Sequence, residues 1–145
     1  MKKWLTIVFL TLVLLNLSAQ SDESFRIENY NLGDGNLAID GYDPVAYFIE
    51  EKAVEGSDEF AFVYKGILYH FYSAENRDKF KAAPERYEPE YGGWCAYQMG
   101  REGEKVSINP ESFELKDGRL YLFYDKFFVN TKTKWLKNRQ ELNQK

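Results

Sequence analysis

Residues 69–95 read YHFYSAENRDKFKAAPERYEPEYGGWC, and the rest of the chain is arranged around this stretch. It begins in the second strand of a predicted hairpin, passes through a short helix and two prolines, and ends after a pair of glycines. It also holds the only histidine, His70, and the only cysteine, Cys95, among the 145 residues. Any chemistry that needs an imidazole or a thiol therefore has to use this stretch.

Working outward, the sequence predicts two β-hairpins. Each consists of two short segments rich in aromatic and aliphatic residues, joined by two residues that end in glycine, as a tight hairpin turn requires. The segments are 60–64 and 67–72 around Lys65-Gly66, and 113–116 and 119–123 around Asp117-Gly118. Alternation along the second strand puts Tyr69 and Phe71 on one face and His70 on the other.

Helices are predicted where a capping residue precedes a helical segment. Ser73 is a good N-cap for a helix that runs to about Ala83 and stops at Pro84. Asp43 is expected to cap a brief helical turn over residues 45–49, with Pro44 at the first position. We also expect a helix over residues 94–99 before Gly100, a helix from Tyr124 or Asp125 to the end with Phe128, Trp135 and Leu136 as core contacts, strands at 37–39 and 106–108, and loops at 50–59, 85–90 and 101–105.

These elements together predict a small single domain of the α+β class, in which short antiparallel hairpins alternate with short helices. Short antiparallel strands exclude a doubly wound parallel sheet. Aromatic residues make up 17% of the chain and are expected to form much of the core.

The chain is expected to divide into three parts. Residues 1–20 are predicted to be a signal peptide, because Lys2 and Lys3 precede an apolar run of about 14 residues and then small residues. That run is shorter than the ~20 residues of a membrane-spanning helix, so we expect cleavage rather than a retained anchor. Residues 21–36 are expected to form a flexible N-terminal segment, and residues 37–145 the folded domain with its C-terminal helix. The mature protein is then expected in the periplasm or outside the cell, with no stable membrane anchor.

The net charge argues against a nucleic-acid-binding function, and the cysteine content excludes an internal disulfide. The net charge of −4 becomes −6 when Lys2 and Lys3 are removed. An acidic protein lacks the basic surface that a general nucleic-acid binder needs, so no nucleic-acid partner is expected. One cysteine cannot form an internal disulfide.

Cys95, His70 and Met99 are the candidate metal ligands, and copper or zinc is the expected metal. Thiolate and imidazole bind both metals, and a thioether adds a soft ligand suited to copper. Met99 follows Cys95 by four residues, so both side chains can share one helical face. In the alternative interpretation, His70 simply projects from a strand and Met99 fills a gap in the core.

Two other interpretations of Cys95 stay open. If a helix begins at Gly92 or Gly93, Cys95 lies in its first turn, where the helix dipole stabilises a thiolate. His70 could then act as a base in a thiol-dependent enzyme or redox protein. Alternatively, Cys95 is a buried structural residue, and the domain binds a protein partner or a small apolar ligand without any cofactor. No catalytic residue is assigned, and Glu85, Glu88 and Glu90 are expected in a solvated loop.

The order of these motifs resembles that of the YHS domain family. The family's DPVCGM-like start is matched by Asp43, Pro44 and Val45. Its central Tyr-x-Phe-Cys-Ser-x-x-Cys segment and the spaced residues that follow are matched by Tyr69, Phe71, Ser73, Phe80, Pro84 and Tyr87. The resemblance implies a small α+β domain that is often linked to metal handling, notably of copper and other heavy metals.

The chain departs from the metal-binding form of this family at three positions. Where that form carries cysteines, this chain has Ala46, Tyr72 and Asn76. The chain is similar instead to an exported branch of YHS-domain proteins, with GYDPVAYF, SAENRDKF, YGGWCAY and DGRLYLFY, over roughly residues 36–136. We therefore expect an exported YHS-like domain, whose metal, if it binds one, is held through Cys95.

Overall fold

The computed structural model describes residues 20 and 22–142. Apart from Gln20, the predicted signal peptide lies outside the described residues. Among the residues that are described, none of the helices combines the length and the apolar character that crossing a bilayer requires.

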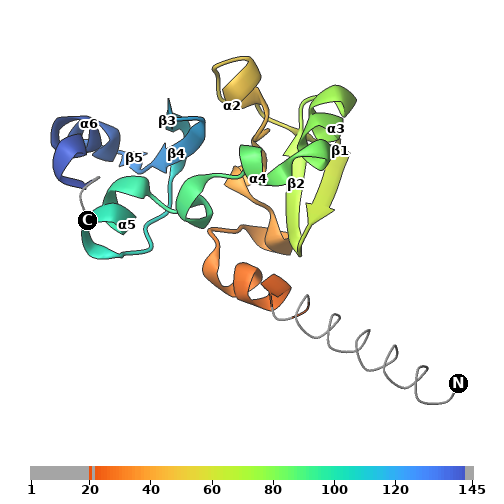
Figure 1. The fold of residues 1–145 in the computed structure, drawn as a ribbon, viewed down its shortest axis with the longest axis horizontal. Coiled ribbons are helices and arrows are strands. Elements are labelled where there is room, and N and C mark those ends of the chain that lie inside the picture. Colours follow the sequence, from red (N-terminus) through yellow and green to blue (C-terminus); the bar gives the residue numbers. More distant parts are fainter. Residues whose placement is uncertain (1–19, 21, 143–145) are drawn as a thin grey trace, which may run out of the picture.

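The described chain is a small α+β domain in which three two-stranded antiparallel sheets are interleaved with short helices, as the sequence predicted. Figure 1 shows the β1–β2 hairpin with α3 at one end of the molecule, and the β3–β4 hairpin with α5 and α6 at the other. The helices are α2 Ala46–Ile49, α3 Ala74–Ala82, α4 Pro84–Tyr87, α5 Ala96–Glu102 and α6 Thr131–Leu142. The strands are β1 Ser57–Tyr64, β2 Ile67–Phe71, β3 Asn109–Lys116, β4 Arg119–Phe123, β5 Asp125–Lys126 and β6 Val129–Asn130, and the 3-10 turns are η1 Asp34–Asn36, η2 Ile39–Gly41 and η3 Glu90–Gly93.

The first hairpin and its helix form as predicted. The turn residues Lys65 and Gly66 have φ angles of 46° and 78°, which suit a tight two-residue hairpin. Ser73 caps α3, because its hydroxyl accepts the backbone N–H of Asn76 at 3.2 Å. On the buried face, the ring centroid of Phe80 lies 4.7 Å from that of Tyr69. The aromatic residues of the central stretch therefore form the core of this half.

The second hairpin forms the core of the other half. Its turn, Asp117-Gly118, is the predicted one, with φ angles of 52° and 74°. Trp135 of α6 packs on Phe123 of β4 with ring centroids 5.7 Å apart, which confirms its predicted place in the core. The prediction is wrong for Leu136 and Phe128, which are both exposed.

In the first half, three predicted elements differ from the structure. Residues 37–39 do not form a strand: Ile39 adopts φ 53° and begins the turn η2, leaving isolated β-bridges at Leu37 and Ala38. The strand β1 extends back to Ser57, into the predicted loop. Pro84 does end α3, but it also begins α4, since proline suits the first position of a helix.

In the second half, three more boundaries differ. Helix α5 starts after Cys95 and continues through Gly100 to Gly103, whose φ of 71° makes it the C-cap. Residues 106–108 form no strand before Asn109; instead the Val106 carbonyl accepts the N–H of Cys95 at 2.9 Å. The C-terminal helix starts at Thr131 rather than near Asp125, because the β5–β6 hairpin comes first.

The N-terminal segment, residues 21–36, contacts the rest of the domain where it is described, and its expected flexibility stays a prediction. Residues 22–29 are helical, and Arg26 is only 7% exposed. The Trp94 indole N–H donates to the Asn29 carbonyl at 2.7 Å. At Gly92, which has φ 62°, a Cβ atom would lie 2.9 Å from the Tyr30 ring. The double glycine therefore lets the N-terminal segment pack closely against the end of the central stretch.

Candidate functional site

Asp43 is a fully buried carboxylate at the junction of three elements. Its Oδ1 accepts the backbone N–H groups of Val45, at 2.7 Å, and Ala46, at 3.2 Å. Its Oδ2 accepts the backbone N–H of Tyr72, at 2.9 Å, and the side-chain amide of Asn76, at 2.7 Å. Asp43 therefore accepts N–H groups at the start of α2 as predicted, but the helix begins at Ala46, so Val45 and not Asp43 is its N-cap residue. The same carboxylate also holds the end of β2 and the first turn of α3.

The positions where the resemblance places cysteines, Ala46, Tyr72 and Asn76, all meet at Asp43. Each of the three donates one N–H to its carboxylate. Ala46 offers no ligand atom, the Tyr72 side chain is 64% exposed, and the Asn76 amide points its N–H₂ end at Asp43. A carboxylate has about four lone-pair positions, so four donors satisfy Asp43. These residues do not fit a copper or zinc site.

Cys95 immediately precedes α5, and its side chain is fully buried. Its sulfur accepts the backbone N–H of Tyr124 at 3.4 Å and lies 3.3 Å from Thr131 Oγ1. Thr131 Oγ1 donates its one proton to the Tyr124 carbonyl at 2.9 Å, so the thiol is the donor in the contact with Thr131. Cys95 therefore joins the start of α5 to the chain that enters α6.

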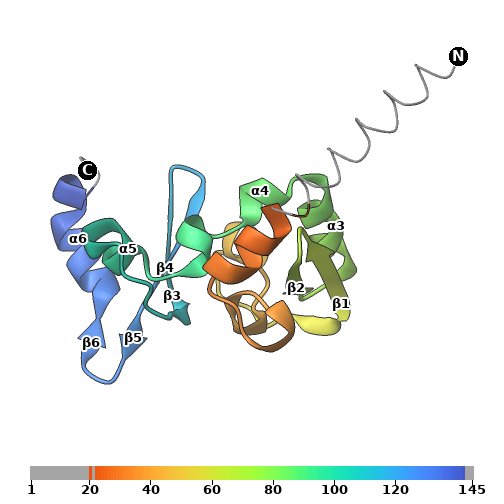
Figure 2. The same ribbon diagram turned by 90° about the horizontal axis from the view of Figure 1, so that it is seen from below.

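The other two predicted ligands lie in different places. Met99 is one turn along α5, and its backbone N–H donates to the Cys95 carbonyl at 3.0 Å. His70 is on β2 beside Gly41, where a Cβ atom would lie 3.7 Å from His70 Nδ1. Figures 1 and 2 both place β2 and α5 in separate parts of the fold. Cys95 and Met99 therefore lie one helical turn apart, joined by a backbone hydrogen bond, whereas His70 lies on β2 in another part of the fold.

No group of three or more His, Cys, Asp or Glu residues suited to a metal ion occurs in the part of the chain that the structure describes. Because the set that the sequence suggested includes a methionine, this finding does not test it directly. Metal binding through Cys95, His70 and Met99 stays a prediction.

A buried ionic cluster around Glu88 was not predicted from the sequence. Glu88 was expected in a solvated loop, but its side chain is only 11% exposed and is paired with Arg26. The Tyr69 hydroxyl donates to Glu88 Oε1 at 2.5 Å, and Arg26 Nη1 donates to the Tyr30 hydroxyl at 3.0 Å. The cluster therefore fastens the N-terminal helix to α4 and β2. The sequence signal was weak, because Arg26 and Glu88 are 62 positions apart.

Alkaline pH is expected to destabilise the protein through its buried tyrosines. Burial raises the pKa of Tyr69 well above its ordinary value, and the nearby Glu88 raises it further. Burial also raises the pKa of Tyr47, whose hydroxyl donates to the Pro110 carbonyl at 2.9 Å. Above about pH 10, tyrosines of the unfolded chain lose their protons before the buried tyrosines of the folded protein do, so the free energy of unfolding falls as pH rises. Below about pH 10, the stabilisation that comes from the raised pKa values is fully present. Urea unfolding across this range measures the slope; an equally steep slope in Tyr69→Phe would contradict the assignment.

The thiol of Cys95 is expected to be inert in the folded protein. A fully buried sulfur that is packed between Thr131 and the Tyr124 N–H cannot meet an aqueous reagent. We expect reaction with a thiol reagent such as dithionitrobenzoate to be negligible in the native protein and stoichiometric in denaturant. Rapid labelling of the native protein would instead support a thiol-dependent function.

The chain matches no protein-family model, no curated protein and no solved structure at a significant level. The α+β class therefore rests on the elements described above. The proposed function of the protein rests on the geometry around Asp43 and Cys95 and on the surface.

Proposed function

We propose that the protein is an exported, non-catalytic binding domain of the YHS type, which acts through its surface and not through a bound metal. The observation that carries this proposal is the saturated carboxylate of Asp43. It takes four N–H donors, three of them from Ala46, Tyr72 and Asn76, where the metal-binding form of the resembled family has cysteines. At this point the chain has a structural junction that holds α2, β2 and α3 together.

The surroundings of Cys95 support the same proposal. A thiol enzyme needs its sulfur within reach of substrate and of a base. Here the sulfur is fully buried, its polar neighbours are Thr131 and Tyr124, and His70 lies on β2 of the first hairpin. The thiol has the contacts of a packing residue.

Metal titration tests this proposal against copper or zinc binding. We expect Cu(I) and Zn(II), titrated in competition with a chelating indicator, to show no stoichiometric site of micromolar or tighter affinity. Cys95→Ala and His70→Ala should then give the same titration curve as the unmodified protein. Tight binding that is lost in both variants, while circular dichroism shows them folded, would contradict the proposal and establish the metal set that the sequence suggested.

A further inference from the structure

The third hairpin, β5–β6, carries two aromatic residues at its tip. Its turn is Phe127-Phe128, and the two side chains are 95% and 103% exposed. Figure 2 shows this hairpin projecting from the body of the molecule beside α6. Two exposed phenylalanine side chains do not contribute to the core. Adjacent large apolar groups on a protein surface often mark interaction sites.

The backbone at this tip is also unfavourable for its residues. Phe127 has φ 57°, a left-handed conformation that bulky side chains rarely adopt. The first turn residues of the other two hairpins, Lys65 and Asp117, also have positive φ, but each is followed by a glycine, whereas both residues of this turn are phenylalanines. Strained backbone conformations at residues other than glycine are often found at functional sites. Without a function, residues that form turns more easily than phenylalanine would be expected here. The phenylalanines are therefore best explained by a role outside the fold.

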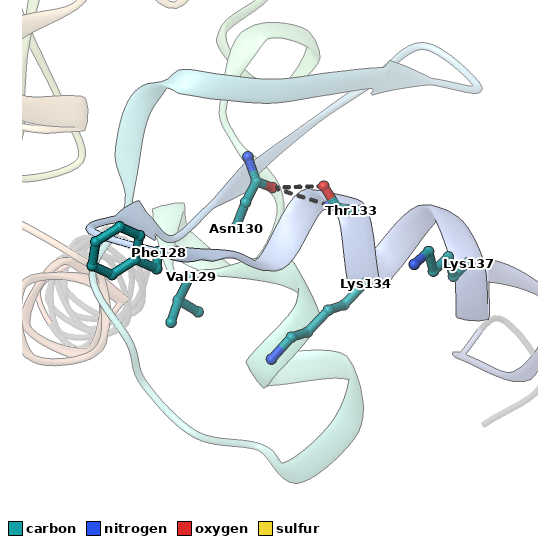
Figure 3. A pocket seen from close by; sticks show the side chains of 6 residues that line it. All are labelled: Phe128, Val129, Asn130, Thr133, Lys134 and Lys137. Carbon is teal, nitrogen blue, oxygen red and sulfur yellow. Dashed lines mark hydrogen bonds between the residues drawn. The ribbon is translucent and has the colours of Figure 1, made fainter.

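The same end of the chain is basic, although the protein is acidic. Residues 125–145 contain six Lys or Arg and two Asp or Glu, a net charge of +4, whereas the whole chain carries −4 and the remainder therefore −8. Phe128, Lys134 and Lys137 line one open hollow of about 330 Å³. In Figure 3, Phe128 and Lys137 lie at its two ends, with Lys134 between them. Lys126 adjoins the turn on β5 and is exposed. Apolar rings and positive charges thus occur together.

The shape of the tip favours a fluid surface over a protein pocket. Two rings that project from a narrow hairpin need a partner that closes around them. The interface of a bilayer does so without a preformed cavity, and basic residues beside the rings attract anionic headgroups. We infer that Phe127 and Phe128 insert into the interface of an anionic lipid surface, while Lys126, Lys134 and Lys137 contact its phosphates.

Docking of this kind is peripheral and reversible. The inferred lipid binding depends on the proposed function in one respect: both require that the domain acts through its surface. Because the charge component is exposed, salt screens it, and binding should weaken as ionic strength rises. A positive metal titration would overturn the proposed function without changing the result of a vesicle experiment, so the two failures can be told apart.

The test is co-sedimentation of the full chain with vesicles of phosphatidylcholine, with and without phosphatidylglycerol. The variant Phe127→Gly/Phe128→Asn places glycine at the turn position that has a positive φ, so it should fold at least as well as the unmodified protein. We expect its partition onto anionic vesicles to fall about tenfold or more, because two apolar rings are removed. The apolar residues 4–17 are present in both proteins, so the difference between them reports the tip alone.

A charge-matched pair tests the lysines. Lys134→Glu/Lys137→Glu should abolish the preference for anionic vesicles. Lys52→Glu/Lys81→Glu makes the same change in net charge on exposed residues outside this segment and should keep the preference. Equal losses in the two pairs would mean that only total charge matters and would overturn the inference.

A third measurement reports insertion directly. Phe128→Trp should show added fluorescence that shifts to the blue with anionic vesicles and is quenched by brominated lipid. Unchanged partition of the Gly-Asn variant, or a tryptophan that lipid does not quench, would show that the tip does not enter the bilayer and would leave a protein partner as its occupant.

Discussion

Replacing Asp43 with asparagine is expected to lower the free energy of unfolding by about 3 kcal/mol or more, although the two side chains are nearly isosteric. The carboxylate is fully buried and accepts four N–H groups. An asparagine amide has one oxygen, so its N–H₂ end would face two donors and leave them unsatisfied. Each buried donor without a partner costs about 1–3 kcal/mol. Asp43→Ala should be worse, since all four donors lose their acceptor and a cavity is added.

Urea unfolding followed by circular dichroism measures this effect. Asp34→Asn is the matched control, because Asp34 is exposed in the turn η1 and its substitution should change stability by less than about 0.5 kcal/mol. Equal midpoints for Asp43→Asn and Asp34→Asn would show that the carboxylate is not the junction of α2, β2 and α3.

The second large effect is expected at the buried ion pair. Arg26→Met should lower the free energy of unfolding by about 3 kcal/mol, because it leaves the Glu88 carboxylate buried without its cation. The value is at the low end for a broken buried pair, since Glu88 still accepts the Tyr69 hydroxyl at 2.5 Å. Hydrogen exchange in residues 22–29 should also become faster, because Arg26 fastens this helix to the domain.

A double variant distinguishes the loss of the ion pair from the loss of packing by the apolar parts of the two side chains. Arg26→Met/Glu88→Leu should be more stable than Arg26→Met alone, because no unpaired charge is left inside. Glu85→Gln is the control: Glu85 is 79% exposed and lies 3.9 Å from Lys65, so little change is expected. If the double variant lost the sum of the two single effects, the charges would not be coupled.

The predictions from sequence succeeded where a few neighbouring residues decide the conformation. Lys65-Gly66 and Asp117-Gly118 specify tight turns because glycine tolerates positive φ, and Ser73 caps α3 through a bond to a residue three positions later. Asp43 was likewise predicted to bind the start of α2, which it does, although Val45 is the N-cap residue. Its contacts with Tyr72 and Asn76, 29 and 33 positions away, were not.

The failures have a common physical cause. Glu88 looks like a loop residue until Arg26 approaches from the N-terminal helix, and burial rather than local propensity then determines its role. Cys95 and His70 stand out by their rarity, yet rarity carries no information about distance. The Phe127-Phe128 turn was predicted as helix, because nothing in its composition resembles a turn and its strain is visible only in the backbone.

The sequence by itself determined the α+β class, the first two hairpins, the cap of α3 and the absence of an internal disulfide, since each depends on composition or on residues within one turn. Only the tertiary structure decided that Ala46, Tyr72 and Asn76 converge on Asp43, that Cys95 is sealed between Thr131 and Tyr124, and that Phe127 and Phe128 face water. These facts depend on packing between segments that are distant in the chain, and the spacing of residues does not encode that packing.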